Sequence, residues 1–175
     1  VVPVTASTEC TAVIECVPPP HTGCTPGFWK NCTIHWQLTG YTTGQRVSSV
    51  FSFGNCCSSL GNLSLASALD LGGGRGVCDA AGHLLRNGVA ALLNASSPEV
   101  DYPFTDQEVI ASVNAALSSC NRATILGLAS ELDRNNNLGC RGANGEGLPC
   151  HRLSNIPRVA PTRVLEDSRV APTRQ

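Results

Sequence analysis

The sequence predicts a mainly α-helical protein, a small disulfide-stapled helical bundle with an extended arm at each end. Three observations support this fold class. Apolar residues recur at helical spacing through the middle of the chain, ten cysteines are spread along its 175 residues, and both ends follow other patterns, including proline-containing stretches. We expect an N-terminal arm at 1–23, a helical disulfide-rich body at 24–140 and a Pro-containing C-terminal arm at 141–175.

The N-terminal arm is predicted from a strand-like pattern. Val2, Val4 and Ala6 alternate with polar or proline positions, and the period of two continues as far as residue 16. Three consecutive prolines at 18–20 then form a stiff polyproline spacer. We therefore expect this arm to be extended.

The clearest helix is expected around residues 81–93. Its apolar residues recur at intervals of three and four, and Arg86 and Asn87 lie on the opposite face. The apolar face consists of Ala81, Leu84, Leu85, Gly88, Val89, Leu92 and Leu93.

A second helix is predicted to begin at Thr105. Thr105 and Glu108 have the spacing of a capping box, in which a hydroxyl and a carboxylate accept hydrogen bonds from backbone N–H groups that the helix leaves unpaired. The core face of this helix consists of Val109, Ile110, Val113, Ala116 and Leu117.

A third helix is expected to end at the asparagine run 135–137. Its core face consists of Ile125, Leu128, Ala129 and Leu132. A shorter helix is predicted at 63–71, where three glycines at 72–74 end it, and 43–50 is predicted to add a further turn or two. Together these helices are expected to pack as a small bundle.

The C-terminal arm contains a short internal repeat. Arg-Val-Ala-Pro-Thr-Arg occurs at 158–163 and again at 169–174. Two copies are too few for a repeat architecture, and the polar, proline-containing composition is by itself typical of a disordered chain. The two copies begin eleven residues apart, and a chain of that length spans up to about 35 Å when it is extended.

The cysteines predict a disulfide framework and an extracellular location. An even number of cysteines without any metal-type CxxC pair is typical of a secreted protein. The chain begins at Val1 without a leader, so we expect that a signal peptide has been removed. The disulfide candidates are Cys10, Cys16, Cys24, Cys32, Cys56, Cys57, Cys78, Cys120, Cys140 and Cys150.

Sequence spacing alone leaves the connectivity of these cysteines open. Local pairs would join Cys10 to Cys16 and Cys24 to Cys32, although Cys10 and Cys16 can instead tie the arm to the body. The adjacent Cys56 and Cys57 are expected to take different partners, because a bridge between neighbouring residues strains the peptide.

Charge and hydropathy exclude two classes of partner. The chain has 12 basic and 13 acidic residues and no dense cluster of Lys or Arg, so we expect no nucleic-acid partner. No apolar run approaches 18 residues, so we expect no membrane span. Near-neutral charge suits a glycosylated protein or one that assembles.

The sequence predicts no catalytic residue, no cofactor and no metal site, and hence no enzyme. None of the recognised nucleophile, phosphate or dinucleotide motifs occurs, and the four histidines lack metal-pair spacing. A mixed site at Cys150 and His151 stays open. Asp133, Asn135 and Asn137 have the spacing that starts a calcium loop, but a helix C-cap explains the asparagines equally well.

Three sequons make Asn31, Asn62 and Asn94 candidate glycosylation sites. In the C-terminal arm, Thr162 and Thr173 each follow a proline and are candidates for O-linked sugar.

The most distinctive segment is 23–31, Gly-Cys-Thr-Pro-Gly-Phe-Trp-Lys-Asn. Pro26 and Gly27 predict a turn, and Phe28 and Trp29 are expected to pack on the first helices.

This segment resembles the opening of a module found in uncharacterised bacterial secreted and surface proteins. The later motifs of that module also have counterparts here, over residues 23–140. They are Leu-Leu-Asn-Ala at 92–95, Asp-Tyr-Pro at 101–103, Glu-Val at 108–109 and Leu-Gly-Cys at 138–140. The resemblance implies an extracellular module and assigns no catalytic residue.

Two functional hypotheses follow. In the first, the protein is a secreted structural subunit that binds copies of itself and forms an extracellular filament or surface layer through its arms. The apolar residues of the assembly arms would be Val2, Val4, Val159, Val164 and Val170. In the second, the protein is a cell-surface adhesin or glycan-binding module.

The glycan-binding hypothesis depends on exposed aromatic side chains that would stack on sugar. The available residues are Trp29, Trp36, Tyr41 and Tyr102, and most of these are expected in the core. The sequence therefore favours the structural hypothesis.

Overall fold

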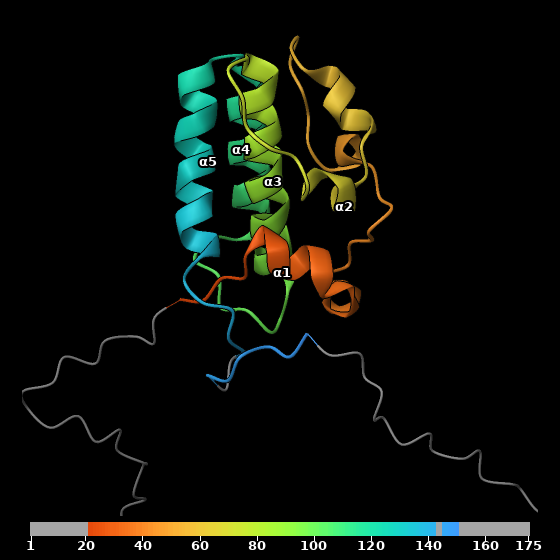
Figure 1. Cartoon of the computed structure of the whole chain (residues 1–175), viewed down its shortest axis with the longest axis vertical. Coiled ribbons are helices and arrows are strands. Elements are labelled where there is room, and N and C mark those ends of the chain that lie inside the picture. Colours follow the sequence, from red (N-terminus) through yellow and green to blue (C-terminus); the bar gives the residue numbers. More distant parts are fainter. Residues whose placement is uncertain (1–20, 143–144, 151–175) are drawn as a thin grey trace, which may run out of the picture.

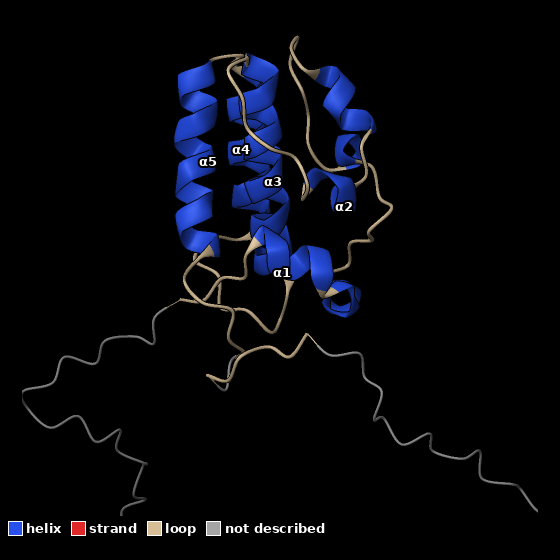
Figure 2. Ribbon diagram, viewed as in Figure 1, coloured by secondary structure: helices blue, strands red, loops and turns tan. Residues whose placement is uncertain are grey.

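The computed structural model describes residues 21–142 and 145–150 of the chain. This part is mainly helical, and its β-structure is confined to isolated bridges (Figures 1 and 2). The mainly α, disulfide-stapled fold class is confirmed for the body. The arm residues 1–20 and 151–175 lie outside the described residues.

Three helices form the bundle: α3 (Val77–Ser96), α4 (Asp106–Ser118) and α5 (Arg122–Asn136). On the other side of α3 lie shorter elements (Figure 1). They are α1 (Pro26–Asn31), η1 (Thr33–Leu38), η2 (Val47–Ser49), η3 (Ser58–Asn62) and α2 (Leu65–Ala68). Helix α3 is thus the central element of the body.

Helix α3 is buried on nearly every side, whereas the sequence predicted that only one apolar face would be buried. Asn87, which was expected on the polar face, is 1% exposed. Small residues make this burial feasible, because they let neighbouring backbones approach closely. At Gly88 a Cβ atom would lie 3.1 Å from Val113 Cγ2 on α4, so glycine sets the closest approach of these two helices.

The predicted capping box of α4 is present. Glu108 N–H donates to the Thr105 hydroxyl at 3.3 Å, and Thr105 N–H donates to the Glu108 carboxylate at 2.8 Å. The hydrogen bond from the Thr105 backbone, followed by that from its hydroxyl, lowers the pKa of Glu108 below its usual value.

Helix α5 ends at Asn136, inside the asparagine run that predicted its end. Two of these asparagines bond to their own helix: Asn135 Nδ2 donates to the Glu131 carbonyl at 2.9 Å and Asn137 Nδ2 to the Asp133 carbonyl at 2.7 Å. The run therefore behaves as a helix C-terminus, which was the alternative to a calcium loop.

Two local predictions were wrong in detail. Pro26 and Gly27 begin α1 instead of forming a turn, because the Thr25 hydroxyl caps the helix by accepting from Phe28 N–H at 3.2 Å. The helix predicted at 63–71 is only the four-residue α2, which begins after the cap residue Ser64 and ends before Leu69. The further turn predicted at 43–50 is η2.

Replacing Thr105 by Ala is expected to lower the free energy of unfolding by about 1 kcal/mol, because the first turn of α4 loses its cap. Glu108 has a lowered pKa in the folded state. Its contribution to the free energy of unfolding is therefore present above its unfolded pKa and is lost as pH falls through the folded pKa. The difference between the two proteins should therefore shrink in acid. Urea unfolding at several pH values measures both effects.

The matched control for this prediction is Thr124→Ala on α5. Thr124 is also exposed and lies in the first turn of its helix, but Asn121 provides the cap there. This variant should differ from the parent protein by less than about 0.5 kcal/mol. Equal losses in the two variants would contradict the capping role.

Candidate functional site

The two ends of the body are fastened together at one end of the bundle (Figure 1). Cys24 and Cys140 form a disulfide with their Cα atoms 4.3 Å apart, although 116 positions separate them in the sequence. Next to this bridge Gly23 N–H donates to the Gly139 carbonyl at 3.1 Å. At Gly23 a Cβ atom would lie 2.1 Å from the Asn135 carbonyl oxygen, so only glycine fits at this contact.

A second disulfide joins Cys32, which follows α1, to Cys150. We call the region around these two bridges the stapled pole. The predicted local pair of Cys24 with Cys32 is therefore wrong. Helix α1 separates these cysteines, and its six residues span about 9 Å, beyond the Cα separation of about 7 Å that a disulfide tolerates.

The side chain of Asn94, near the C-terminus of α3, holds the stapled pole together. Its Oδ1 accepts from Cys24 N–H at 2.9 Å and from Trp29 Nε1–H at 3.0 Å. Its Nδ2 donates to the Cys24 carbonyl at 2.9 Å and to Asn136 Oδ1 at 3.0 Å. Asn94 and Trp29 are fully buried, and buried polar groups need hydrogen-bond partners. A carboxamide whose oxygen and nitrogen both form hydrogen bonds meets this requirement.

Asn136 extends this network to α5 and to the segment that precedes α4. Its Oδ1 also accepts from the Tyr102 hydroxyl at 2.9 Å, and its Nδ2 donates to the Asn87 carbonyl at 3.0 Å. Burial, with a smaller contribution from the nearby Glu131 carboxylate, raises the pKa of Tyr102. Tyr102 therefore stays protonated and continues to donate to Asn136.

His35 connects the stapled pole to the segment that ends at Cys150. Its Nδ1 lies 2.7 Å from Glu99 Oε2 and its Nε2 lies 3.0 Å from the Pro149 carbonyl oxygen. A carboxylate and a carbonyl both accept hydrogen bonds, so the imidazole lies between two acceptors from different segments of the chain.

The opposite end of the bundle is closed by the adjacent cysteines. Cys56 is bonded to Cys120 between α4 and α5, and Cys57 is bonded to Cys78 at the start of α3. The prediction that these neighbours take different partners is confirmed. Within the described residues no cysteine is free, and Cys10 and Cys16 lie outside them.

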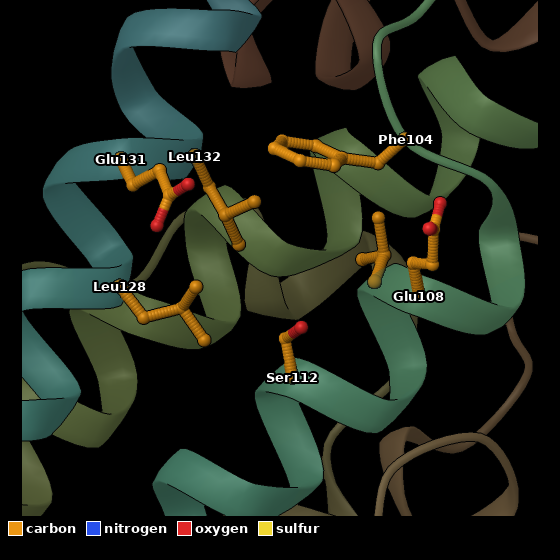
Figure 3. Close-up of a pocket in the computed structure, with 7 residues that line it drawn as sticks. Phe104, Glu108, Ser112, Leu128, Glu131 and Leu132 are labelled. Carbon is orange, nitrogen blue, oxygen red and sulfur yellow. The ribbon is translucent and has the colours of Figure 1, made fainter.

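Helices α4 and α5 border a small pocket on the surface of the bundle (Figure 3). Its apolar lining consists of Phe104, Val109, Leu128 and Leu132. Ser112 adds a hydroxyl, and Glu108 on α4 and Glu131 on α5 place carboxylates on opposite sides (Figure 3). We call this the α4–α5 pocket, and sequence reasoning did not identify it.

The candidate glycosylation sites differ sharply in exposure. Asn31 and Asn62 are exposed. Asn94 is fully buried, and its Nδ2, the atom that would bear a sugar, donates two hydrogen bonds. A glycan on Asn94 would therefore require the stapled pole to be open. The threonine candidates of the C-terminal arm, Thr162 and Thr173, lie outside the described residues.

The aromatic residues considered for sugar binding are mostly core residues, as expected. Trp29, Trp36 and Tyr102 are exposed by 0%, 2% and 8% respectively, whereas Tyr41 is half-buried. The apolar residues assigned to the assembly arms lie outside the described residues. They are Val2, Val4, Val159, Val164 and Val170.

Three of the four histidines belong to the described residues. His21 lies 3.4 Å from the Asp101 carboxylate, His35 belongs to the stapled pole, and His83 lies on α3. No group of three metal-ligating side chains occurs among residues 21–142 and 145–150. His151 of the mixed Cys150 and His151 site lies outside the described residues, and Cys150 itself is bonded to Cys32. None of the helices described is long and apolar enough to cross a bilayer.

The fold and the stapled pole define a class of small disulfide-rich helical module in which the two ends of the domain are covalently joined. Residues 24–139 match the Protodermal factor 1 C-terminal domain, and the chain belongs to this family. The match begins at Cys24 and ends one residue before its partner Cys140, so the family boundaries coincide with the stapled pole. No curated protein and no solved structure matches the chain.

This match corrects the resemblance to bacterial secreted proteins, because the matching family is a plant family. Several of the motifs that suggested the resemblance belong to the stapled pole: Cys24, the start of α1, Asn94 and the closing Leu-Gly-Cys. They report the structural requirements of this pole and do not establish a bacterial relationship.

Replacing Asn94 by Ala is expected to lower the free energy of unfolding by about 2–4 kcal/mol, because the buried Trp29 Nε1–H and both backbone groups of Cys24 lose their partner. The exposed Asn62 offers the matched control, and Asn62→Ala should change stability by less than about 0.5 kcal/mol. Denaturant unfolding with the disulfides intact provides the measurement. A similar small effect for both variants would rule out the central role of Asn94.

Proposed function

We propose that this protein is a secreted structural subunit that binds copies of itself and forms an extracellular filament or surface layer through its two arms. The observation that supports this proposal most is the stapled pole. The described chain begins at His21 and ends at Cys150, and both residues are close to this pole in sequence and contact, so both arms start from the same end of the body.

Four disulfides within one small body are typical of a protein that folds in an oxidising compartment. Secretion is the simplest route to such a compartment. The proposal of an extracellular location therefore rests on the chemistry of the cysteines and is independent of the assembly proposal.

The stapled pole gives such a subunit a mechanical property. Tension applied between the two arms reaches Cys24 from one side and Cys150 from the other, and the Cys24–Cys140 and Cys32–Cys150 disulfides transmit it across the stapled pole. The chain between Cys32 and Cys140 carries none of that load, because the two covalent bonds bypass it. A subunit of this design stays folded when an assembled material is stretched.

The second candidate function, a cell-surface adhesin or glycan-binding module, has weaker support. Three of its four candidate stacking residues are buried, which leaves Tyr41 as the partly exposed ring. Burial and, to a smaller extent, the nearby Asp106 carboxylate raise the pKa of Tyr41, so its hydroxyl stays protonated. One half-buried ring is a small platform for a sugar.

Deleting residues 157–175 is expected to leave a folded, soluble body and to weaken or abolish assembly, and deleting residues 1–9 should have a smaller effect. Sedimentation velocity of the full chain and the two deletions at matched concentration measures particle mass. Unchanged polymers would contradict the assembly proposal. A lower melting temperature with unchanged mass would show that the arm packs on its own body, and a monomeric full chain would favour the binding-module alternative.

Stretching single molecules between residues 1 and 175 is expected to extend only the arms while the disulfides are intact. Adding a reductant should release the chain between Cys24 and Cys140, whose separation of 116 residues corresponds to roughly 380–420 Å of extra length. Optical-tweezer force curves record this difference. Unfolding of the body at low force without reductant would show that the stapled pole does not carry the load.

A further inference from the structure

The α4–α5 pocket combines an apolar floor with an acidic rim. Phe104 and three aliphatic side chains form the floor, and Glu108 and Glu131 lie on opposite sides of it (Figure 3). Glu108 is engaged in the α4 cap, whereas Glu131 forms no ion pair with any described residue. An exposed carboxylate beside an apolar surface is suited to a ligand that carries an apolar group next to a cation.

The size of the pocket restricts that ligand. Its volume is about 50 Å³, far below the roughly 300–1,000 Å³ of sites that enclose a drug-sized molecule. A hollow of this size accepts a single small side chain of a peptide. The remainder of such a peptide would lie across the rim, within reach of the carboxylates.

The C-terminal arm contains a peptide of this chemistry twice. In each copy of Arg-Val-Ala-Pro-Thr-Arg, small apolar residues are flanked by arginines on both sides. Proline favours an extended backbone, and its missing N–H removes one group that docking would desolvate. The valine fits a small apolar pocket, and an arginine beside it can form a bidentate pair with a carboxylate.

The overall charges of arm and body are also complementary. Residues 151–175 contain five arginines but only two acidic residues, Glu166 and Asp167. Within 21–142 and 145–150 nine acidic residues outnumber seven basic ones. Opposite net charges attract the arm to the body over distances up to about a Debye length, near 8 Å at physiological salt.

We propose that the α4–α5 pocket is the docking site for the Arg-Val-Ala-Pro-Thr-Arg segment of a second copy of this chain. This inference rests on the proposed function and names the contact through which the C-terminal arm links subunits. Each arm carries two copies of the segment, eleven residues apart, so even an arm that fills its own pocket retains a copy for a neighbour. Repetition of this heterologous contact extends an open polymer.

Two full-length variants test the two halves of the contact. Glu131→Arg reverses the charge at the pocket rim, and the double variant Val159→Asp, Val170→Asp makes both docking segments unable to enter an apolar pocket. Neither variant is expected to form polymers by itself. Because the first retains a normal arm and the second a normal pocket, their mixture should form a closed complex in which each Glu131→Arg chain binds one or two chains of the double variant.

The matched control is Asp133→Arg, which makes the same charge reversal two residues further along α5, on another face of the helix. This variant should assemble as the parent protein does. The milder Glu131→Gln should raise the dissociation constant roughly fivefold to tenfold, an effect that shrinks with added salt. Intact mass without reductant and near-ultraviolet circular dichroism establish that each variant is folded.

Sedimentation velocity of the parent protein, the four variants and the mixture decides between the outcomes. Loss of polymers in both variants together with a closed mixed complex supports the docking site. Normal polymers of the Glu131→Arg variant would overturn the docking site and leave the proposed assembly intact. A parent protein that stays monomeric at high concentration would overturn both.

Discussion

The carboxamide of Asn94 is the interaction on which the rest of the structure depends. It joins the backbone of Cys24 and the indole of Trp29, both in the segment around α1, to the side chain of Asn136 on α5, so that with α3 three separate parts of the chain meet. By fixing Cys24 against the end of α3, it holds that cysteine next to the end of α5, where Cys140 reaches it. The disulfide and the buried hydrogen bonds thus hold the same contact.

From this arrangement follow the properties that matter for function. Both arms start from one pole, and two disulfides there join the segments from which the arms start. The other two disulfides close the opposite end, where α3 begins and α4 meets α5. Helices α4 and α5, which meet at this end, border the α4–α5 pocket.

Local sequence predicted the elements whose formation is governed by local interactions. The apolar repeat at 81–93, the Thr105 capping box and the asparagine run all correspond to observed helix faces or ends. Two of the predictions that failed concern burial and disulfide pairing. Asn87 belonged to a polar face by periodicity, but α3 is enclosed on both sides, and Cys24 and Cys32 were neighbours in sequence that α1 keeps apart.

The sequence by itself determined the mainly helical class, the disulfide chemistry and the positions of the main helices, because helix periodicity and capping involve residues at most four positions apart. Only the tertiary structure decided the long-range disulfide partners, the central role of Asn94 and the α4–α5 pocket. Each of these joins residues 16 or more positions apart, and the energy of such a contact depends on the packed arrangement of the helices, which no local spacing specifies.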